Sequence, residues 1–419
     1  MRKTIKLCAF SAAVVCFFIL GLICYYEFTL PGYFYVFKNE DLKLDTRFKI
    51  TADSTAVFME NRSKPAVSIP DENISAGFSG TQGLTLKLFG AFPVKNARVQ
   101  TIKRSMLVPG GNPFGVKMFT KGVMVVGVSD VETLSGVVNP AKAAGIKMGD
   151  IIYLVNGEKV STNEEVAHII SRSGGNPVDI HLERKNKGIN LTMVPALSKD
   201  DNKYKAGLWV RDSSAGIGTI TFYDPTEGAF AGLGHGICDV DTGEILPLLS
   251  GEIVNVNIDS VQKSVAGTPG ELRGSFLPGF AVGNLLLNDE SGVYGQAYRR
   301  AVSGKAIPMA LKQQVKPGSA KILTTIKGRK PKAYKIVIEK VAANSSVKTK
   351  NMIIRITDPE LLEKAGGIVQ GMSGSPIIQG GTLVGAVTHV FINDPVKGYG
   401  IFAENMLESQ NSIGFDKAG

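Results

Sequence analysis

Cysteine and histidine are scarce in this chain of 419 residues, which contains four of each. Three of the cysteines, Cys8, Cys16 and Cys24, lie in one apolar run near the N-terminus. Cys238 is therefore alone in the rest of the chain, which excludes an intramolecular disulfide there. The sequence also lacks an H-E-x-x-H motif, paired C-x-x-C motifs and a Walker loop. We therefore expect no metal, no nucleotide and no other cofactor.

Acidic residues are outnumbered, with 37 Asp and Glu against 47 Lys and Arg, which gives a formal net charge of +10. The basic residues are scattered and no nucleic-acid-binding motif accompanies them, so we expect no nucleic-acid partner. A basic surface that faces anionic lipid or cell-wall polymer is the simpler interpretation. The 48 glycines favour turn-rich β structure, and the length allows two or three domains.

The N-terminus carries a long uncharged run. Three basic residues precede positions 7–26, which contain twenty uncharged residues, enough for a helix to cross about 30 Å of hydrocarbon. The preceding positive charge predicts that the N-terminus lies in the cytoplasm and the rest of the chain outside. A cleaved signal peptide is the alternative, but the bulky residues 24–28 offer no small-x-small site. We expect residues 1–26 to form a cytoplasmic stub and a transmembrane signal anchor.

Residues 27–105 have no recognisable function. Alternating apolar residues predict strands over 84–90 and 94–100. Before them, residues 63–80 are polar and rich in turn formers, which is typical of a spacer. We expect the whole region to be an extracytoplasmic spacer.

Residues 106–196 resemble a PDZ domain. Residues 147–157 end in an Asn-Gly hairpin turn, and a helix expected over 162–173 would form one wall of a peptide groove. PDZ domains add an extended peptide as an extra strand along a sheet edge, so we expect a peptide partner. The alternative is a PDZ fold that only packs on its neighbour. The loop expected to receive a peptide's terminal carboxylate consists of Phe114, Gly115 and Val116.

The segment Gly371-Met372-Ser373-Gly374-Ser375-Pro376 has the pattern of a serine nucleophile. Its glycines let the hydroxyl stand clear and let backbone N–H groups point at the carbonyl oxygen that becomes negative during attack. A tight turn between strands is the alternative. The strand, glycine turn and strand that follow resemble the region after the nucleophile in HtrA and other chymotrypsin-fold peptidases. Ser373 is therefore the candidate nucleophile.

Only four histidines can supply the general base. His168 falls in a predicted amphipathic helix and His181 in an alternating strand, both in the PDZ-like region. His235 lies between two glycines and precedes the serine, which makes it the preferred base. His389, just after the nucleophile hairpin, is its rival. The candidate acids are Asp224, Asp239, Asp241, Asp259, Asp289, Asp358 and Asp394.

Four motifs carry a family resemblance: Gly-Leu-Gly-His-Gly at 232–236, Thr-Asp-Pro-Glu-Leu-Leu at 357–362, and the stretches 366–378 and 385–395. Together they resemble the stage IV sporulation protein B serine peptidases of endospore-forming bacteria. The resemblance implies a Ser-His-Asp peptidase with Ser373 as nucleophile and His235 as general base. It places the acid in the Thr-Asp-Pro motif, at Asp358, only fifteen positions before the serine. The expected oxyanion hole consists of the backbone N–H groups of Gly371 and Ser373.

The expected architecture is mainly β: an N-terminal transmembrane helix, an α+β PDZ domain and a chymotrypsin-like double β-barrel over residues 197–419. The resemblance implies a self-cleaving peptidase of the forespore intermembrane space. Its implied substrate is a membrane protein that restrains an intramembrane protease, which then activates a late sigma factor. A non-catalytic PDZ adaptor with a pseudo-peptidase domain and a broad HtrA-like quality-control protease are the alternatives. HtrA-like proteins usually place PDZ after the peptidase, so the reverse order here favours narrow, regulated cleavage.

Overall fold

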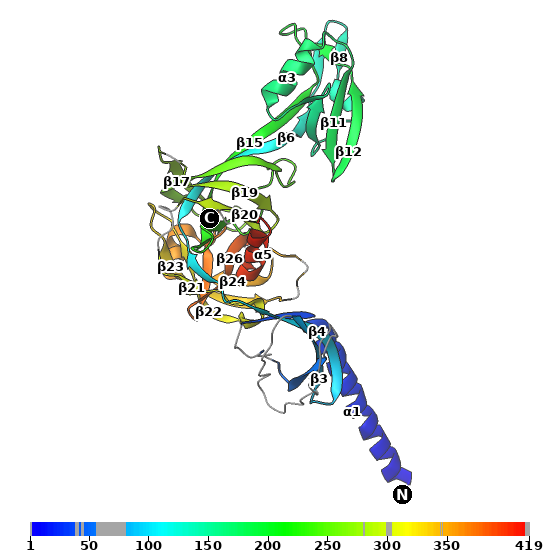
Figure 1. The fold of residues 1–419 in the computed structure, drawn as a ribbon, viewed down its shortest axis with the longest axis vertical. Helices are drawn as coiled ribbons and strands as arrows, with labels where there is room; N and C mark the ends of the chain where they lie inside the picture. The colour runs from blue at the N-terminus through cyan, green and yellow to red at the C-terminus, as the bar shows by residue number, and fades with distance from the viewer. Residues whose placement is uncertain are drawn as a thin grey trace, which may run out of the picture.

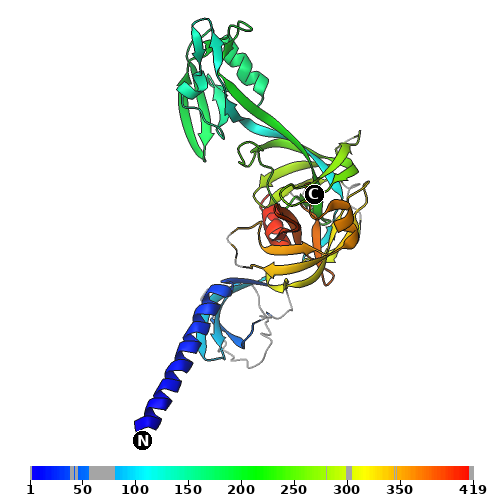
Figure 2. The same cartoon turned by 180° about the vertical axis from the view of Figure 1, so that it is seen from behind.

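The structure is a computed structural model that describes residues 2–37, 42, 46–55, 81–279, 281–298, 304–343, 345 and 347–414. Its parts lie in a row, with the PDZ unit at one end, two β-barrels in the middle and the N-terminal helix at the other end (Figures 1 and 2). The expected fold class, a mainly β chain with an apolar N-terminal helix, is confirmed. Residues 63–80, expected to be a spacer, lie outside the described residues.

A small folded unit replaces the expected spacer. Helix α1 (Arg2–Thr29) is followed by a sheet in the order β1-β4-β3-β2, in which β1 runs parallel to β4. Buried leucines at every second position of β3 contact Tyr26 and Leu30 at the end of α1. Leu22, Ile23 and Tyr26 of α1 complete this core, so the unit depends on a helix that the sequence pattern assigns to a membrane. The strands expected over 84–90 and 94–100 correspond to β3 and β4. The strands are β1 (Tyr33–Phe37), β2 (Ile50–Thr55), β3 (Thr81–Leu88) and β4 (Phe92–Ile102).

The first barrel is a ring of six strands. Each strand pairs with the next in the order β6-β17-β19-β20-β16-β15, and a further pairing of β15 with β6 closes the ring. Three further strands extend the ring: β5 pairs with β15, β18 pairs with β17, and β21 (Ile307–Pro308) pairs with β5. The strands are β5 (Met106–Pro109), β6 (Pro113–Val128), β15 (Leu208–Asp224), β16 (Ala229–Gly232), β17 (Leu248–Gln262), β18 (Glu271–Phe276), β19 (Gly283–Asp289) and β20 (Gly292–Ala297).

The second barrel closes in the order β22-β23-β24-β27-β26-β25. The two barrels confirm the expected double-barrel peptidase fold. Helix α5 (Ala403–Asn411) follows the last strand and packs into a core that contains side chains of both barrels. The remaining elements are β22 (Gly318–Thr324), β23 (Lys332–Val341), β24 (Met352–Ile356), β25 (Pro376–Gln379), β26 (Thr382–Phe391), β27 (Asp394–Phe402), α4 (Pro359–Ala365) and the 3-10 helix η2 (Lys312–Gln314).

The PDZ unit is inserted into the first barrel. Strands β6 and β15 leave the barrel as one antiparallel ribbon and enter the PDZ unit, where β6 pairs with β9 at Val123 and Met124. Helix α3 begins with a capping box formed by Thr162 and Glu165 and covers the expected 162–173. Between β6 and β15 lie β7 (Val131–Thr133), β8 (Gly136–Val138), α2 (Pro140–Ala143), β9 (Ile151–Val155), β10 (Glu158–Lys159), α3 (Asn163–Arg172), β11 (Val178–Arg184), β12 (Lys187–Met193), β13 (Ala196–Leu197) and β14 (Tyr204–Lys205).

The insertion corrects two expectations. Phe114, Gly115 and Val116 do not form a peptide-receiving loop, because they lie in β6 between β15 and β17, where both partners hydrogen bond to them. Phe114 and Val116 pack in the core of the first barrel, and a side chain at Gly115 would come within 2.8 Å of Phe276 on β18, so this stretch is part of the barrel wall. The expected boundaries at 106 and 197 also move, because β5 and the first half of β6 belong to the peptidase. The peptidase domain is therefore discontinuous in sequence.

This arrangement makes a truncation testable. A variant that begins at residue 197 lacks β5 and β6, so its first barrel cannot close, and we expect no cooperative unfolding transition. The matched variant replaces residues 120–212 by an Asn-Gly turn that joins the facing residues Phe119 and Ser213. It keeps the ring, and we expect it to fold, as followed by circular dichroism during urea unfolding. A folded fragment 197–419 would contradict the discontinuous domain.

Candidate active site

A cleft of about 560 Å³ lies between the two barrels. The first barrel contributes residues from β6 and β15 and the loop with His235, and the second contributes the Ser373 loop and the end of β26. Ser373 and His235, far apart in sequence, thus line one cavity. The rest of the lining is mostly apolar and contains no carboxylate.

The nucleophile loop is held by the first barrel. The Thr219 hydroxyl donates to the Gly371 carbonyl at 2.7 Å, and the Thr219 N–H donates to the Ser373 carbonyl at 3.1 Å. The Thr221 hydroxyl donates to the Gly374 carbonyl at 2.8 Å. Gly374 has φ +93°, and a side chain there would come within 2.0 Å of the Thr219 carbonyl oxygen. The glycine after the serine is therefore required by close contact between the barrels as well as by its backbone angle.

Two backbone N–H groups of the nucleophile loop are without a protein acceptor in the described part of the chain. Among the described residues, the N–H groups of Gly371 and Ser373 donate to no protein acceptor, whereas that of Gly374 donates to Val387. Gly371 has φ +93°, the left-handed conformation that glycine adopts at little cost. Two unpaired N–H groups, one of the candidate nucleophile itself and one two residues before it, have the chemistry of an oxyanion hole.

The Ser373 hydroxyl is engaged with a carbonyl. It donates to the backbone oxygen of Thr388 at 2.7 Å, at the end of β26. In the described residues it makes no hydrogen bond to His235. Attack on a substrate requires the hydroxyl to turn from Thr388 toward the imidazole, so this geometry is a resting one.

His235 is oriented by the backbone. Its Nδ1 donates to the carbonyl of Gly236 at 2.9 Å, which leaves Nε2 of the neutral ring as the proton acceptor. Burial lowers the pKa of His235 below its usual 6.5 and outweighs the opposite effect of the Gly236 hydrogen bond. The preceding Leu233 is buried with φ +65°, a strained angle for a residue with a side chain. The loop therefore holds a neutral imidazole at the cleft.

His389 lies beside the base. The rings of His235 and His389 have their centroids 4.9 Å apart and are tilted by 35°. Burial, followed by the unfavourable charge interactions of a protonated His389 with His235 and Lys350, lowers the pKa of His389 to about 4. It is therefore neutral at pH 7 and lines the cleft as a second imidazole. The other two histidines belong to the PDZ unit, on α3 and β11.

Asp358 does not reach this site. It is the N-cap of α4, and its carboxylate accepts hydrogen bonds from the backbone of Glu360, Leu361 and Lys335. The role that the family resemblance gives it, the triad acid, is therefore not supported by this geometry. In the described residues, the group that contacts Nδ1 of His235 is the Gly236 carbonyl. Sequence reasoning missed it because any residue type supplies a carbonyl.

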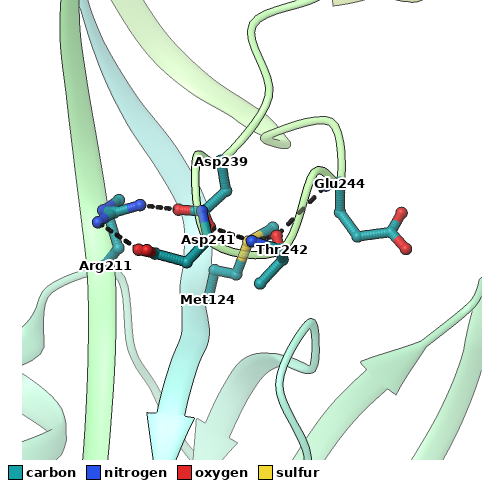
Figure 3. A network of polar contacts seen from close by, with 6 residues as sticks. All are labelled: Met124, Arg211, Asp239, Asp241, Thr242 and Glu244. Carbon is teal, nitrogen blue, oxygen red and sulfur yellow. Dashed lines mark hydrogen bonds and ion pairs between the residues drawn. The ribbon is translucent and has the colours of Figure 1, made fainter.

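Arg211 ties the loop after His235 to β15. Its guanidinium binds Asp239 and, at 2.9 Å, Asp241, and the Asp239 carboxylate also accepts the N–H of Thr242 at 2.9 Å (Figure 3). The Asp239 side chain is fully buried. Burial raises its pKa, but the hydrogen bonds from Thr242 and Arg211 outweigh that effect, and the net pKa is lowered. At the loop's base, Asn288 bonds both Ile237 and Leu246.

A second groove lies in the PDZ unit, with a volume of about 600 Å³. One wall is α3, with Val166, Ala167 and Ile170, and the other is the start of β15. There β15 pairs with β6 on one edge, and in the described part of the chain no strand pairs with its other edge. An unpaired strand edge beside a helix is where an extended peptide can add. Trp209, 65 % exposed, also lines this groove.

A serine and a neutral histidine at the junction of two β-barrels, with a PDZ unit in the same chain, define a PDZ-containing serine peptidase. Residues 202–407 match the model of the SpoIVB peptidase S55 family, and residues 114–193 match that of the PDZ domain. Residues 202–407 therefore form a peptidase domain of the SpoIVB S55 family.

Shorter similarities connect the chain to other proteins. It is 29 % identical over 97 residues to the regulator of sigma-W protease RasP of Bacillus subtilis (strain 168), covering 23 % of this chain and 20 % of that protein. It is 36 % identical over 55 residues to the zinc metalloprotease RasP of Geobacillus kaustophilus (strain HTA426), covering 13 % of each. The chain thus spans about a quarter or less of the length of these curated relatives.

Two solved structures are similar to parts of the fold. The PDZ domain of the SdrC-like protein from Listeria monocytogenes is 19 % identical with a TM-score of 0.18, covering 22 % of this chain and 87 % of that one. The HtrA-type protease AlgW with a decapeptide is 13 % identical with a TM-score of 0.29, covering 48 % of this chain and 54 % of that one.

Replacing Asp358 separates capping from catalysis. Asp358→Ala removes the N-cap of α4 and is expected to cost about 1 kcal/mol of unfolding free energy, measured with urea. Asp358→Asn still caps a helix but cannot serve as a triad carboxylate, so we expect wild-type stability and wild-type cleavage. A fall of about 10⁴-fold in kcat for the Asn variant would restore Asp358 to the triad.

The candidate base, His235, predicts how peptide cleavage depends on pH. His235 must be neutral to accept a proton, and its folded-state pKa lies below 6.5. We therefore expect kcat/KM for a peptide substrate to persist below pH 6.5 and to fall only as the pH passes through that lowered pKa. Circular dichroism at each pH separates this loss from acid unfolding. An acid limb at or above 6.5 would contradict a buried base.

The ion pairs of Arg211 with Asp239 and Asp241 (the Arg211 clamp) predict that loss of Arg211 lowers the free energy of unfolding. Arg211→Met leaves the Asp239 carboxylate buried without its cation, and we expect a loss of about 2 kcal/mol in urea unfolding. Adding Asp239→Asn should restore part of it, because the amide oxygen still accepts the Thr242 N–H. The control is Arg273→Met, which breaks an exposed pair with Glu271 and should cost less than about 0.5 kcal/mol. Equal losses in both arginine variants would refute the clamp.

Proposed function

We propose that this chain is a membrane-anchored serine endopeptidase that cleaves itself and a partner membrane protein during sporulation. The partner restrains an intramembrane protease whose release activates a late sigma factor, and the enzyme acts in the forespore intermembrane space. The observation that carries the proposal is the convergence of Ser373, His235 and the free N–H groups of Gly371 and Ser373 on one cleft, in a peptidase domain of the SpoIVB S55 family.

The catalytic steps follow from the geometry. The Ser373 oxygen attacks the scissile carbonyl while Nε2 of His235 accepts the hydroxyl proton. The carbonyl oxygen becomes negative and is bound by the N–H groups of Gly371 and Ser373. His235 then donates the proton to the leaving amine, and water hydrolyses the acyl-enzyme by the reverse sequence of proton transfers. The Gly236 carbonyl keeps the imidazole in the required tautomer throughout.

The lining of the cleft bears on substrate choice. Ile217, Ile368 and Val390 are among its apolar members, and it contains no lysine, arginine, aspartate or glutamate. A charged side chain entering this cavity would lose its hydration without gaining a partner. The proposed substrates therefore present an uncharged, apolar residue before the scissile bond.

Membrane attachment rests on α1. Residues Ala9–Thr29 form a helix long and apolar enough to cross a bilayer, with a mean hydropathy of 2.2. Tyr26 is 3 % exposed in the core of the N-terminal unit, so removal of this helix would cost that unit part of its core. This supports an uncleaved anchor over a cleaved signal sequence. The basic residues before the apolar run favour a cytoplasmic N-terminus.

The PDZ groove is proposed to bind a peptide segment, either of the partner or of a second copy of this chain. The support is the unpaired edge of β15 beside α3. That strand continues to Thr219, which holds the nucleophile loop. Peptide addition at one end of the strand thus acts on an element that touches the catalytic loop at the other.

The test is self-cleavage by the full chain in vesicles, compared between wild type and Ser373→Ala by gel electrophoresis and N-terminal sequencing. We expect fragments from wild type only, with apolar residues before each cut, because only wild type has the nucleophile. Identical patterns in both would favour the non-catalytic adaptor. The hydrogen bond from the Ser373 hydroxyl to the Thr388 carbonyl supports that alternative, because it holds the hydroxyl away from His235. Digestion of a generic unfolded protein would instead favour broad quality control.

A further inference from the structure

An unbroken row of aromatic rings leads from α1 to the hairpin between β3 and β4. The ring centroids of Phe18 and Phe48 are 6.4 Å apart, and those of Phe48 and Phe89 are 6.0 Å apart, both edge-on. Phe89 is 50 % exposed and Phe92, at the other side of the hairpin turn, is 40 % exposed. The sheet lies alongside the C-terminal half of α1 in both views (Figures 1 and 2).

The position of Phe18 along α1 fixes the depth of this row. The uncharged run 7–26 spans about 30 Å as a helix, so its outer end lies near Tyr26. Phe18 is eight residues earlier, about 12 Å deeper at 1.5 Å per residue. Phe48 contacts it, so Phe48 and its neighbour Phe89 lie within the depth of the outer leaflet whenever α1 spans the membrane.

The helix face and the loop are held rigidly together. Phe18 is one turn before Leu22 and two turns before Tyr26, and these last two residues pack into the core of the sheet. The Phe48 N–H donates to the Tyr26 hydroxyl at 3.1 Å. The row of rings therefore cannot swing away from the membrane without unpacking this unit.

The hairpin turn is suited to an apolar environment. The Phe89 N–H donates to the Lys49 carbonyl at 3.0 Å, and the Ala91 N–H donates to the Leu88 carbonyl at 3.2 Å. Satisfied backbone donors remove the main cost of placing a turn in lipid. Phe89 has φ +54°, a conformation that glycine or asparagine adopts more cheaply. The turn itself does not need phenylalanine there, whereas a lipid contact does.

Two basic residues flank the middle ring of the row, Phe48. Arg47 and Lys49 are exposed on either side of Phe48. Basic side chains beside inserted aromatic rings extend toward the interface, where they attract the headgroups of anionic lipids. An aromatic tip with basic flanks is the composition of interfacial membrane contacts.

We propose that the β3–β4 hairpin tip, with Phe89 and Phe92, inserts into the outer leaflet of the membrane that α1 crosses and forms a second lipid contact. This inference rests on the proposed membrane anchor. Two contacts fix the rotation of the N-terminal unit about α1, so the barrels and the cleft face the membrane in one orientation. The occupant of the apolar tip is lipid, not a protein partner.

Tryptophan quenching by brominated lipid tests the insertion. The chain has one tryptophan, so the Trp209→Phe background is silent, and Phe89→Trp or Phe92→Trp is added to the full-length protein. The vesicles contain phosphatidylethanolamine and phosphatidylglycerol, with bromine in the acyl chains or not. Phe17→Trp reports on the anchor, and Phe119→Trp, 54 % exposed on β6, is the matched control outside the N-terminal unit. Circular dichroism verifies folding of each variant.

We expect bromine to remove roughly half or more of the fluorescence of Phe17→Trp, Phe89→Trp and Phe92→Trp, and to leave Phe119→Trp unchanged. Quenching at position 17 without quenching at 89 and 92 overturns the hairpin insertion and leaves the anchor intact. Absence of quenching at 17 as well overturns the anchor and, with it, this inference. If one hairpin variant fails to fold, the other carries the test.

Discussion

The antiparallel pairing of β6 with β15 is the constraint on which the rest of the structure depends. It runs from Pro113 opposite Thr219 to Val128 opposite Leu208. One end closes the first barrel, and the other carries the PDZ unit. Between them, Arg211 clamps the loop after His235, and Thr219 reaches across to the Ser373 loop. Loss of this pairing would therefore have two effects at once: the first barrel would open, and His235 would no longer be held near Ser373.

Backbone groups hold much of the catalytic arrangement. The Gly236 carbonyl orients His235, the Thr388 carbonyl holds the resting Ser373 hydroxyl, and two N–H groups await the oxyanion. Backbone groups on closed barrels lose little freedom on ordering, so they keep their geometry without the entropy cost of a flexible side chain. A neutral, desolvated imidazole completes this arrangement, and an ionised acid beside it is not part of the described geometry.

Prediction from sequence succeeded where the signal was local. The α3 helix has its capping box within four residues, and the hairpin after Ser373 has its glycine turn between two apolar strands. It failed for Phe114, Gly115 and Val116, because the same short pattern serves a PDZ loop or a barrel strand, and only the pairing partners distinguish them. For residues 27–105 it found the strands that correspond to β3 and β4 but missed the folded unit, because the unit completes its core with side chains of α1. Asp358 in a Thr-Asp-Pro motif is equally compatible with a triad and with a helix cap.

The sequence by itself determined which reactive groups are available: a serine in a glycine-rich turn, four histidines, a single cysteine outside the apolar run, and an apolar run long enough for a bilayer. These are properties of residue type and near neighbours. Only the tertiary structure decided that His235 and His389 share a cleft with Ser373, and that the PDZ unit interrupts the peptidase rather than preceding it. Those outcomes depend on hydrogen bonds and contacts between segments a hundred or more residues apart, such as Thr219 with Gly371, whose partners no local pattern encodes.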